Sequence, residues 1–293
     1  MTTSTSTSTT TTATTGTVPA TGAPLRRPPG GNVRRAAAYE WIRLRSLRST
    51  KWAVGWTAAL AVLFGVSLGM DVRSLPDGAS VGTEVALQNL TVAAELTGMP
   101  LIGLVMGILG IVSVTHEHRY GTIRPAFVAV PRRSDVLLGK TLVMGAAAAA
   151  VAGLGLVLTA FTAAAVSLGG LFTALPPLGG PALALLCYVL VVVLCTVAGM
   201  ALGSLTRSTG IALSLWLVVP FVGETAVYVA LHAVDALEAV RGAANWMPFR
   251  AAQKAVASSD PGALTRLGGT AAFAAWTGAL SVVAGRAVVR RDV

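Results

Sequence analysis

Three places in the sequence carry residue types that could do chemistry. His116-Glu117-His118 offers metal-binding side chains, Gly139-Lys140-Thr141 matches the end of a phosphate-binding P-loop, and Glu224 is a carboxylate inside an apolar run. A zinc-binding helix needs two histidines four residues apart, but these two are only two apart. A P-loop needs a glycine where this chain has Ser134, and it needs a strand before it. We therefore predict no metal, no nucleotide and no other cofactor at these places.

The carboxylate of Glu224 falls in the outer half of a long apolar run, where burying a charge is costly. It either faces a substrate path or pairs with an outer-side arginine such as Arg241, and the structural alternative is a hydrogen-bonded carboxyl near Thr225. The sequence does not choose between these. No nucleophile, base and orienting residue occur together as a set, so we do not expect an enzyme.

The apolar composition of the chain predicts the helices that must position these residues. The chain has 293 residues, of which 54% are hydrophobic and 12% are charged, against about 25% charged in a soluble domain. Its apolar residues form runs of roughly 20, the length that a helix needs to cross a bilayer. We therefore predict an all-α membrane protein with six transmembrane helices, at about 53–70, 98–115, 136–168, 182–205, 211–231 and 270–289.

Two segments precede this six-span domain of residues 53–293. Residues 1–32 are rich in Thr, Ser and Pro and cannot bury a core, so we expect a disordered leader. Residues 33–52 are predicted to form an amphipathic helix at the membrane interface, with an apolar face of Val33, Ala37, Trp41, Leu44 and Leu47. Glu40 and Arg48 interrupt that face, and an ordinary basic juxtamembrane segment is the alternative.

The distribution of Lys and Arg predicts the orientation in the membrane. Of the 22 Lys and Arg residues, eight precede the first span, five lie in residues 116–140, one is Arg207, and three lie at the C-terminal end. The other connections hold only five. The positive-inside rule then puts both termini and residues 116–140 in the cytoplasm of a multi-pass plasma-membrane protein. We read the net charge of +10 as this topology signal, and we expect no nucleic-acid partner.

Residues 116–140 form a polar segment between the second and third predicted spans. A Glu, a Gly-Thr pair, an Arg, a Pro, two Arg and a Lys follow one another in it: Glu117, Gly121, Thr122, Arg124, Pro131, Arg132, Arg133 and Lys140. This order resembles the cytoplasmic loop between the second and third spans in permease subunits of the type 2 class of ATP-binding-cassette exporters. The resemblance extends to the surface helix, the six spans, the short second cytoplasmic turn and the long last outer segment, in the Ala- and Gly-rich manner of the actinobacterial branch. Pro125 departs from the pattern, because such loops usually continue as helix there.

The resemblance implies a function and partners. The chain would be the membrane half of an exporter that works by alternating access, with a separate ATP-binding subunit and a second permease subunit, identical or different. The eight residues above, with Arg119 and Arg207, would dock the ATP-binding subunit, and the arginines could pair with its acidic groups. A basic loop that only obeys the positive-inside rule is the alternative for this segment. A six-span scaffold or a secondary transporter without an ATPase is the alternative for the chain, and the substrate is not indicated.

Two further features bear on helix packing. Three pairs of glycines lie four residues apart, a spacing that allows close helix contacts either within the chain or between two copies: Gly65 and Gly69, Gly103 and Gly107, Gly199 and Gly203. Residues 245–257 form either a short hairpin that re-enters the outer leaflet under a cover of protein or an amphipathic loop on its surface.

Overall fold

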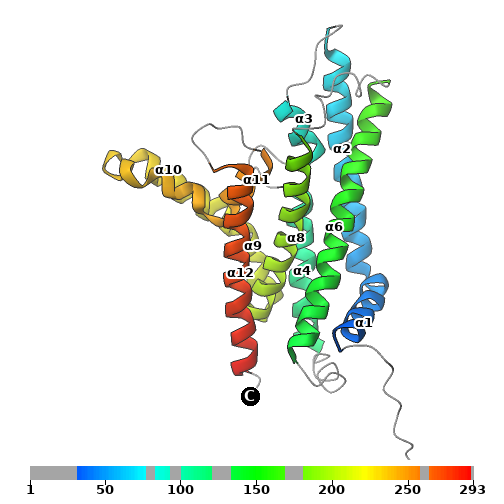
Figure 1. The fold of residues 1–293 in the computed structure, drawn as a ribbon, viewed down its shortest axis with the longest axis vertical. Coiled ribbons are helices and arrows are strands. Elements are labelled where there is room, and N and C mark those ends of the chain that lie inside the picture. Colours follow the sequence, from blue (N-terminus) through cyan, green and yellow to red (C-terminus); the bar gives the residue numbers. More distant parts are fainter. Residues whose placement is uncertain are drawn as a thin grey trace, which may run out of the picture. The chain divides into compact units, whose positions relative to one another are not determined.

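The computed structural model describes residues 32–76, 83–92, 100–120, 133–168, 181–257 and 264–291. The chain divides into Met1–Gly31 and Asn32–Val293, and all described residues belong to the second unit. Every regular element among them is a helix, which confirms the predicted all-helical class (Figure 1). The predicted leader lies outside the described residues, except for Asn32 at the start of the first helix.

The structure describes twelve helical elements. Two of them are irregular, because η1 is a π-helix and η2 is a 3₁₀-helix. In order, they are α1 (Asn32–Ser46), α2 (Arg48–Ser74), α3 (Thr83–Leu90), α4 (Leu101–Tyr120), α6 (Arg133–Val166), α8 (Pro181–Thr206), α9 (Thr209–Val218), η1 (Val219–Gly223), α10 (Glu224–Ala233), η2 (Asp235–Trp246), α11 (Pro248–Ala257) and α12 (Arg266–Arg291).

Five helical stretches among the described residues are long and apolar enough to cross a bilayer, which supports a membrane-embedded protein. They are Arg48–Ser74, Leu138–Val166, Ala182–Thr206, Thr209–Ala233 and Arg266–Val288, and they correspond to five of the six predicted spans. The remaining predicted span, 98–115, falls on α4, whose apolar stretch Leu101–Glu117 is shorter. A crossing by α4 therefore stays a prediction.

Helix α1 ends earlier than the predicted surface helix and packs through a different face. Leu47 is extended, with φ −74° and ψ 131°, and the next residue begins α2, so residues 48–52 belong to the long apolar helix. Ala36, Glu40 and Leu44 are buried, whereas Trp41 is 50% exposed. Glu40, which interrupts the apolar face in the sequence, thus lies in the contact between α1 and the other helices.

Close glycine contacts bring the long helices together. Helix α8 packs against α4, α6, α11 and α12. A Cβ atom on Gly199 of α8 would collide with the backbone of Gly107 in α4. In the same way, a Cβ atom on Gly65 of α2 would lie 2.6 Å from the carbonyl oxygen of Thr159 in α6. These glycines serve contacts within the chain, one of the two alternatives that their spacing allowed.

The helical stretch Thr209–Ala233 is interrupted around Pro220. The N–H group of Glu224 donates to the carbonyl of Val219, five residues back, which makes the five-residue π-helix η1. Proline has no N–H donor and crowds the preceding turn, so the regular i to i−4 bonding cannot continue through it. The interruption places Glu224 at the start of α10, which packs against η2 (Figure 1).

Helix α11 occupies most of residues 245–257 and is covered by protein on one face. Ala251, Ala252, Ala255 and Val256 are buried, and the helix packs against α12 and α8. The contact with α12 is close, since a Cβ atom on Gly269 would lie 2.8 Å from the backbone nitrogen of Ala255. A re-entrant hairpin requires such a cover, while its depth in a bilayer stays a prediction.

Candidate functional site

Four charged side chains from three helices meet where α1 packs against α6 near the end of α4. They are Glu40 and Arg43 of α1, Glu117 of α4 and Lys140 of α6, and we name them the ion cluster. Arg43 and Lys140 both donate hydrogen bonds to the Oε1 atom of Glu117. The Nη1 atom of Arg43 also lies 3.2 Å from Oε2 of Glu40. The cluster therefore joins the last turn of α4, which precedes residues 121–132, to α6, which follows them, and it joins both helices to α1.

A backbone carbonyl of α4 completes the ion cluster. The Nη2 atom of Arg43 donates to the carbonyl oxygen of Ser113 at 2.8 Å, and Nζ of Lys140 donates to the same oxygen at 3.2 Å. Ser113 and Glu117 are four residues apart, so their polar groups lie on one face of α4. Each cation thus bonds to a carboxylate and to a carbonyl of that face.

The charges of the ion cluster are largely buried and balance one another. The side-chain exposed fractions are 4% for Lys140, 7% for Glu40, 14% for Glu117 and 18% for Arg43. Two carboxylates face two cations, which leaves no net charge. Burial of charged groups is tolerated where they are paired and hydrogen-bonded in this way.

Gly139 and Lys140, whose sequence matches the end of a P-loop, both take part in contacts between helices. A Cβ atom on Gly139 would lie 2.8 Å from Cβ of Ala36 and 3.1 Å from the carbonyl oxygen of Val33. The glycine therefore allows α1 to approach α6. Lys140 follows it and bonds to Glu117. Gly139 thus permits the contact between α1 and α6, and Lys140 joins α6 to α4.

The ion cluster borders a hollow among α4, α6, α8 and α12. This cavity has a volume of about 120 Å³, and Glu117 and Lys140 line it together with Ser204 and Ser281. Most of its other lining residues are apolar. The pair between Glu117 and Lys140 thus lies at the edge of a space rather than inside solid packing, in agreement with the partial exposure of Glu117.

The structure brings a second predicted docking element near the ion cluster. Arg207 lies between α8 and α9 with a left-handed φ of 52°, and its N–H group bonds to the carbonyl of Gly203 at 3.0 Å. At the start of α9, the hydroxyl of Thr209 bonds to the hydroxyl of Thr115 in α4 at 2.9 Å. Thr115 precedes Glu117 by two residues, so the turn at Arg207 lies against the same end of α4.

The other predicted docking residues are placed less completely. Arg119 is exposed on the last turn of α4. Arg133 begins α6, but its side chain is outside the described residues. Also outside the described residues are Gly121, Thr122, Arg124, Pro131 and Arg132, together with the unexplained Pro125.

Glu224 is engaged in a structural contact with α11. Its Oε1 atom accepts a hydrogen bond of 2.9 Å from the N–H group of Phe249, and Oε2 accepts one of 2.8 Å from the N–H group of Arg250. These donors belong to the first turn of α11, where N–H groups have no partner inside the helix and a carboxylate is favoured by the helix dipole. The structure thus supports the hydrogen-bonded alternative, although the partners come from α11 and not from Thr225.

The side chain of Arg250 adds to this contact. Its guanidinium lies 3.6 Å from the ring centroid of Tyr228, one turn after Glu224 in α10. Burial lowers the pKa of this guanidinium, while Tyr228 and Glu224 act against that shift. Arg241, the partner considered from the sequence, donates through Nε to the carbonyl oxygen of Leu231 at 3.3 Å.

The sequence reasoning missed Glu40 and Arg43 as members of the site. A signal for them existed, because Glu40 interrupts the apolar face of its helix and Arg43 follows three residues later, within ion-pair reach.

No group of three or more His, Cys, Asp and Glu side chains among the described residues is placed to hold a metal ion. Comparison with models of protein families, with curated proteins and with solved structures finds no match to this chain.

Proposed function

We propose that this chain is the membrane-spanning permease subunit of an ATP-driven exporter of the type 2 class. The observation that carries the proposal is the ion cluster. It ties the residues on both sides of the connection 121–132, through Glu117 and Lys140, to each other and to α1. A partner that pressed on this connection would move α1, α4 and α6 together, as rigid-body transmission from a docked ATPase requires.

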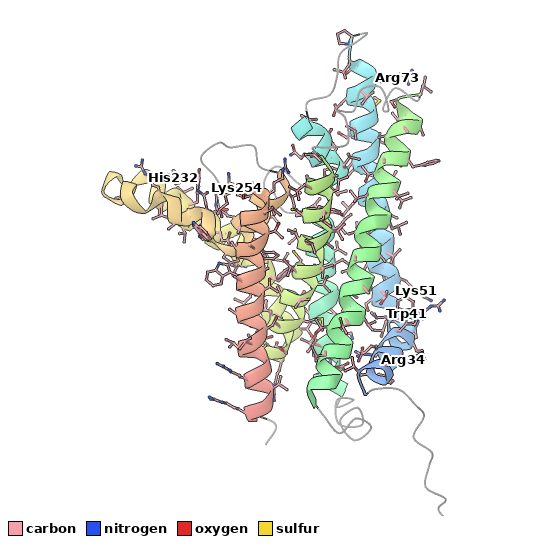
Figure 2. The ribbon with its side chains drawn as sticks, in the orientation of Figure 1. Arg34, Trp41, Lys51, Arg73, His232 and Lys254 are labelled. Carbon is pink, nitrogen blue, oxygen red and sulfur yellow. The ribbon has the colours of Figure 1, made fainter. Side chains whose placement is uncertain are left out.

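We infer that α4 also crosses the membrane, which brings the number of spans in this permease to six. The helix is apolar along Leu101–Glu117 and packs against α8, α2 and α9. An apolar stretch shorter than the bilayer core can still cross it, at a modest cost, where the bilayer thins or flanking side chains reach the interface. Six crossings then put the ion cluster and both termini on the Lys- and Arg-rich cytoplasmic side. Figure 2 shows that Trp41 and Lys51 lie near one end of α2 and Arg73 near the other, so the proposal places Arg73 on the outer side.

The exposed face of α1 supports its position at the membrane interface. Tyr39, Trp41 and Ile42 are all exposed, and the guanidinium of Arg45 lies 5.9 Å from the ring centroid of Trp41. Aromatic residues beside basic ones are typical of a helix at the level of the lipid headgroups. The helix would thus rest on the cytoplasmic leaflet while its opposite face holds the ion cluster.

The ion cluster changes which residues we assign to the ATPase contact. Glu117 and Lys140 bond within the chain, so we assign them to the rigid base of the docking element. The contact itself then belongs to Arg119, Arg133 and Arg207 with the connection 121–132. Arginine in such positions can form bidentate pairs with carboxylates of the partner.

The contact of Glu224 weighs against the secondary-transporter alternative. Such a transporter needs a membrane carboxylate that can exchange a proton or an ion. Both oxygens of Glu224 accept hydrogen bonds from α11, which suits a structural role. A membrane scaffold without an ATPase remains the second candidate.

The test is co-purification with an ATP-binding-cassette subunit encoded beside this chain. Tagged chain and ATPase are co-expressed, and the ATPase recovered and its ATP hydrolysis are measured for the natural chain and for Arg207→Glu and Arg133→Glu. Arg290→Glu is the matched control, because Arg290 is exposed on the last turn of α12. We expect at least a tenfold loss of recovered ATPase in the first two variants and none in the control.

Three results would contradict the proposal. One is a genome in which no P-loop ATPase lies beside this chain and none assembles with it. Another is assembly that survives both charge reversals, and the last is equal loss with Arg290→Glu, which points to general basicity.

A further inference from the structure

A groove runs between α2 and α4 at the end of α2 where α1 joins it. Its volume is about 400 Å³, which falls in the range of about 300–1,000 Å³ that is common for pockets of small ligands. Ser49 supplies a hydroxyl at the start of α2, and the other walls are apolar or aromatic, among them Trp52 and Trp56 of α2 with Ile108 and Val112 of α4. The groove therefore suits an apolar occupant with a polar group at one end.

The groove is open toward the bilayer. Trp52 is 69% exposed and Trp56 is 59% exposed, and both belong to the stretch Arg48–Ser74, which is long and apolar enough to cross a bilayer. The exposed surface of such a helix faces lipid. An occupant of the groove therefore enters from the lipid, where phospholipid is the most abundant molecule.

The spacing of Arg48, Trp52 and Trp56 along α2 matches the layers of a phospholipid. Each helical residue adds about 1.5 Å, so Trp52 lies roughly 6 Å beyond Arg48 and Trp56 roughly 6 Å further. The headgroup layer on each side of a bilayer is about 5–8 Å thick. With Arg48 at the level of the phosphates, Trp52 thus reaches the boundary of the hydrocarbon region, and Trp56 lies beside the acyl chains.

The end of the groove at Arg48 carries positive charge that the described part of the chain does not balance. Arg45, Arg48 and Lys51 are exposed, and the ion pairs among the described residues do not include them. The sequence has no Asp or Glu between residues 41 and 70. An acidic headgroup complements this charge, whereas the cationic part of a zwitterionic headgroup would find no unpaired carboxylate among the described residues here.

Trp52 offers a hydrogen-bond donor at the hydrocarbon boundary. No hydrogen bond joins its indole N–H to another described residue, in contrast to the indole N–H groups of Trp216 and Trp276, which donate to backbone carbonyls. A tryptophan at this level of a membrane keeps its rings in apolar surroundings and its N–H in polar ones. The ester carbonyls of a phospholipid lie at the same level and supply an acceptor.

We propose that the groove between α2 and α4 binds one acidic phospholipid. One acyl chain lies along Trp56 and Ile108, and an ester carbonyl accepts a hydrogen bond from Trp52. The phosphate pairs with the guanidinium of Arg48, whose planar set of donors matches phosphate oxygens, and Ser49 lies beside it. The site goes beyond the exporter function, since it needs α2 in the membrane but no ATPase partner.

Native mass spectrometry of the full chain in detergent tests the site. The purified chain is titrated with phosphatidylglycerol and with phosphatidylcholine that carry the same acyl chains, and the lipids bound per chain are counted. We expect the first phosphatidylglycerol to bind at least about fivefold more tightly than the first phosphatidylcholine, the effect of one well-placed cation on an acidic lipid. Arg48→Gln should remove this preference and leave the binding of phosphatidylcholine unchanged.

Matched variants separate the groove from general basicity. Lys51→Gln removes a neighbouring cation that lies two residues after Ser49 and so on another side of α2, and it should leave the preference intact. Ile108→Trp narrows the groove from its wall and should weaken both lipids. Val157→Trp adds the same ring at an exposed position of α6 and should weaken neither.

Four results would overturn the proposal. They are equal affinity for the two lipids, an equal effect of Arg48→Gln and Lys51→Gln, and unchanged binding in Ile108→Trp. The fourth is a dimer that retains no phospholipid, which would make a second copy of the chain the occupant of the groove.

Discussion

Removal of the charge of Glu117 should destabilise the protein far more than removal of an exposed carboxylate. In Glu117→Gln the shape of the side chain is kept, but Lys140 and Arg43 lose their shared partner. Glu40 remains bonded to Arg43, so one positive charge is left buried, mainly on Lys140, whose side chain is 4% exposed. Breaking a buried ion pair from one side costs about 3–5 kcal/mol. The partial exposure of Glu117, 14%, favours the lower end, about 3 kcal/mol.

A double variant tests whether this cost arises from the unbalanced charge. Glu117→Gln with Lys140→Met removes one carboxylate and one cation together and leaves Glu40 paired with Arg43. Replacement of both members of a buried pair is often close to neutral. We therefore expect the double variant to be within about 1 kcal/mol of the natural chain, with a large coupling energy in the double-mutant cycle.

The assay is unfolding of the purified chain in mixed micelles as the share of denaturing detergent rises, followed by circular dichroism. Asp71→Asn is the matched control, since Asp71 is exposed on the last turn of α2 and its change should have little effect on the free energy of unfolding. The reasoning is refuted if Glu117→Gln costs no more than the control. It is refuted as well if the two single effects simply add in the double variant.

Three other predictions test separate parts of the fold. Gly199→Val should lower folded yield and stability by more than about 2 kcal/mol, because its side chain would collide with α4, whereas Gly153→Ala has open space and should be neutral in the same unfolding assay. Glu224→Gln should weaken the N-terminal contact of α11 by about 1–2 kcal/mol and speed hydrogen exchange of its first turn, and unchanged exchange would contradict the capping role. In a chain that keeps Trp41 as its single tryptophan, fluorescence should be quenched most by lipids brominated near the headgroup, and deepest quenching near the chain ends would contradict an interfacial α1.

Much of the fold was accessible from the sequence because a bilayer imposes simple length and composition rules. Apolar runs of about 20 residues predict helices without knowledge of their neighbours, and five of the six predicted spans match such helices. The end of α1 at Ser46 was not predicted, since residues 48–52 are basic and read as surface helix. Nor was the π-helix around Pro220, because a proline in an apolar run indicates a kink but not how the backbone bonds are rearranged.

The site was only partly accessible for a related reason. Glu117 and Lys140 stood out by their place in a polar segment, and the structure brings them together. The bond between Glu117 and Arg43 joins residues 74 positions apart, and nothing local in the sequence records such a pairing. The one sign of this pairing in the sequence was Glu40, which interrupts the apolar face of its helix.

The sequence by itself determined that the chain is helical and apolar enough for a membrane, where its polar segment lies, and that its Gly-Lys-Thr letters lack the context for nucleotide binding. These properties follow from composition and residue spacing. Both reflect the solvent around the chain and not the contacts between its distant residues. Only the tertiary structure decided what the polar residues do. It paired Glu117 with both Arg43 and Lys140, and it used Glu224 to cap α11. Buried polar groups must find partners, and which partners are in reach is set by helix packing between distant parts of the chain.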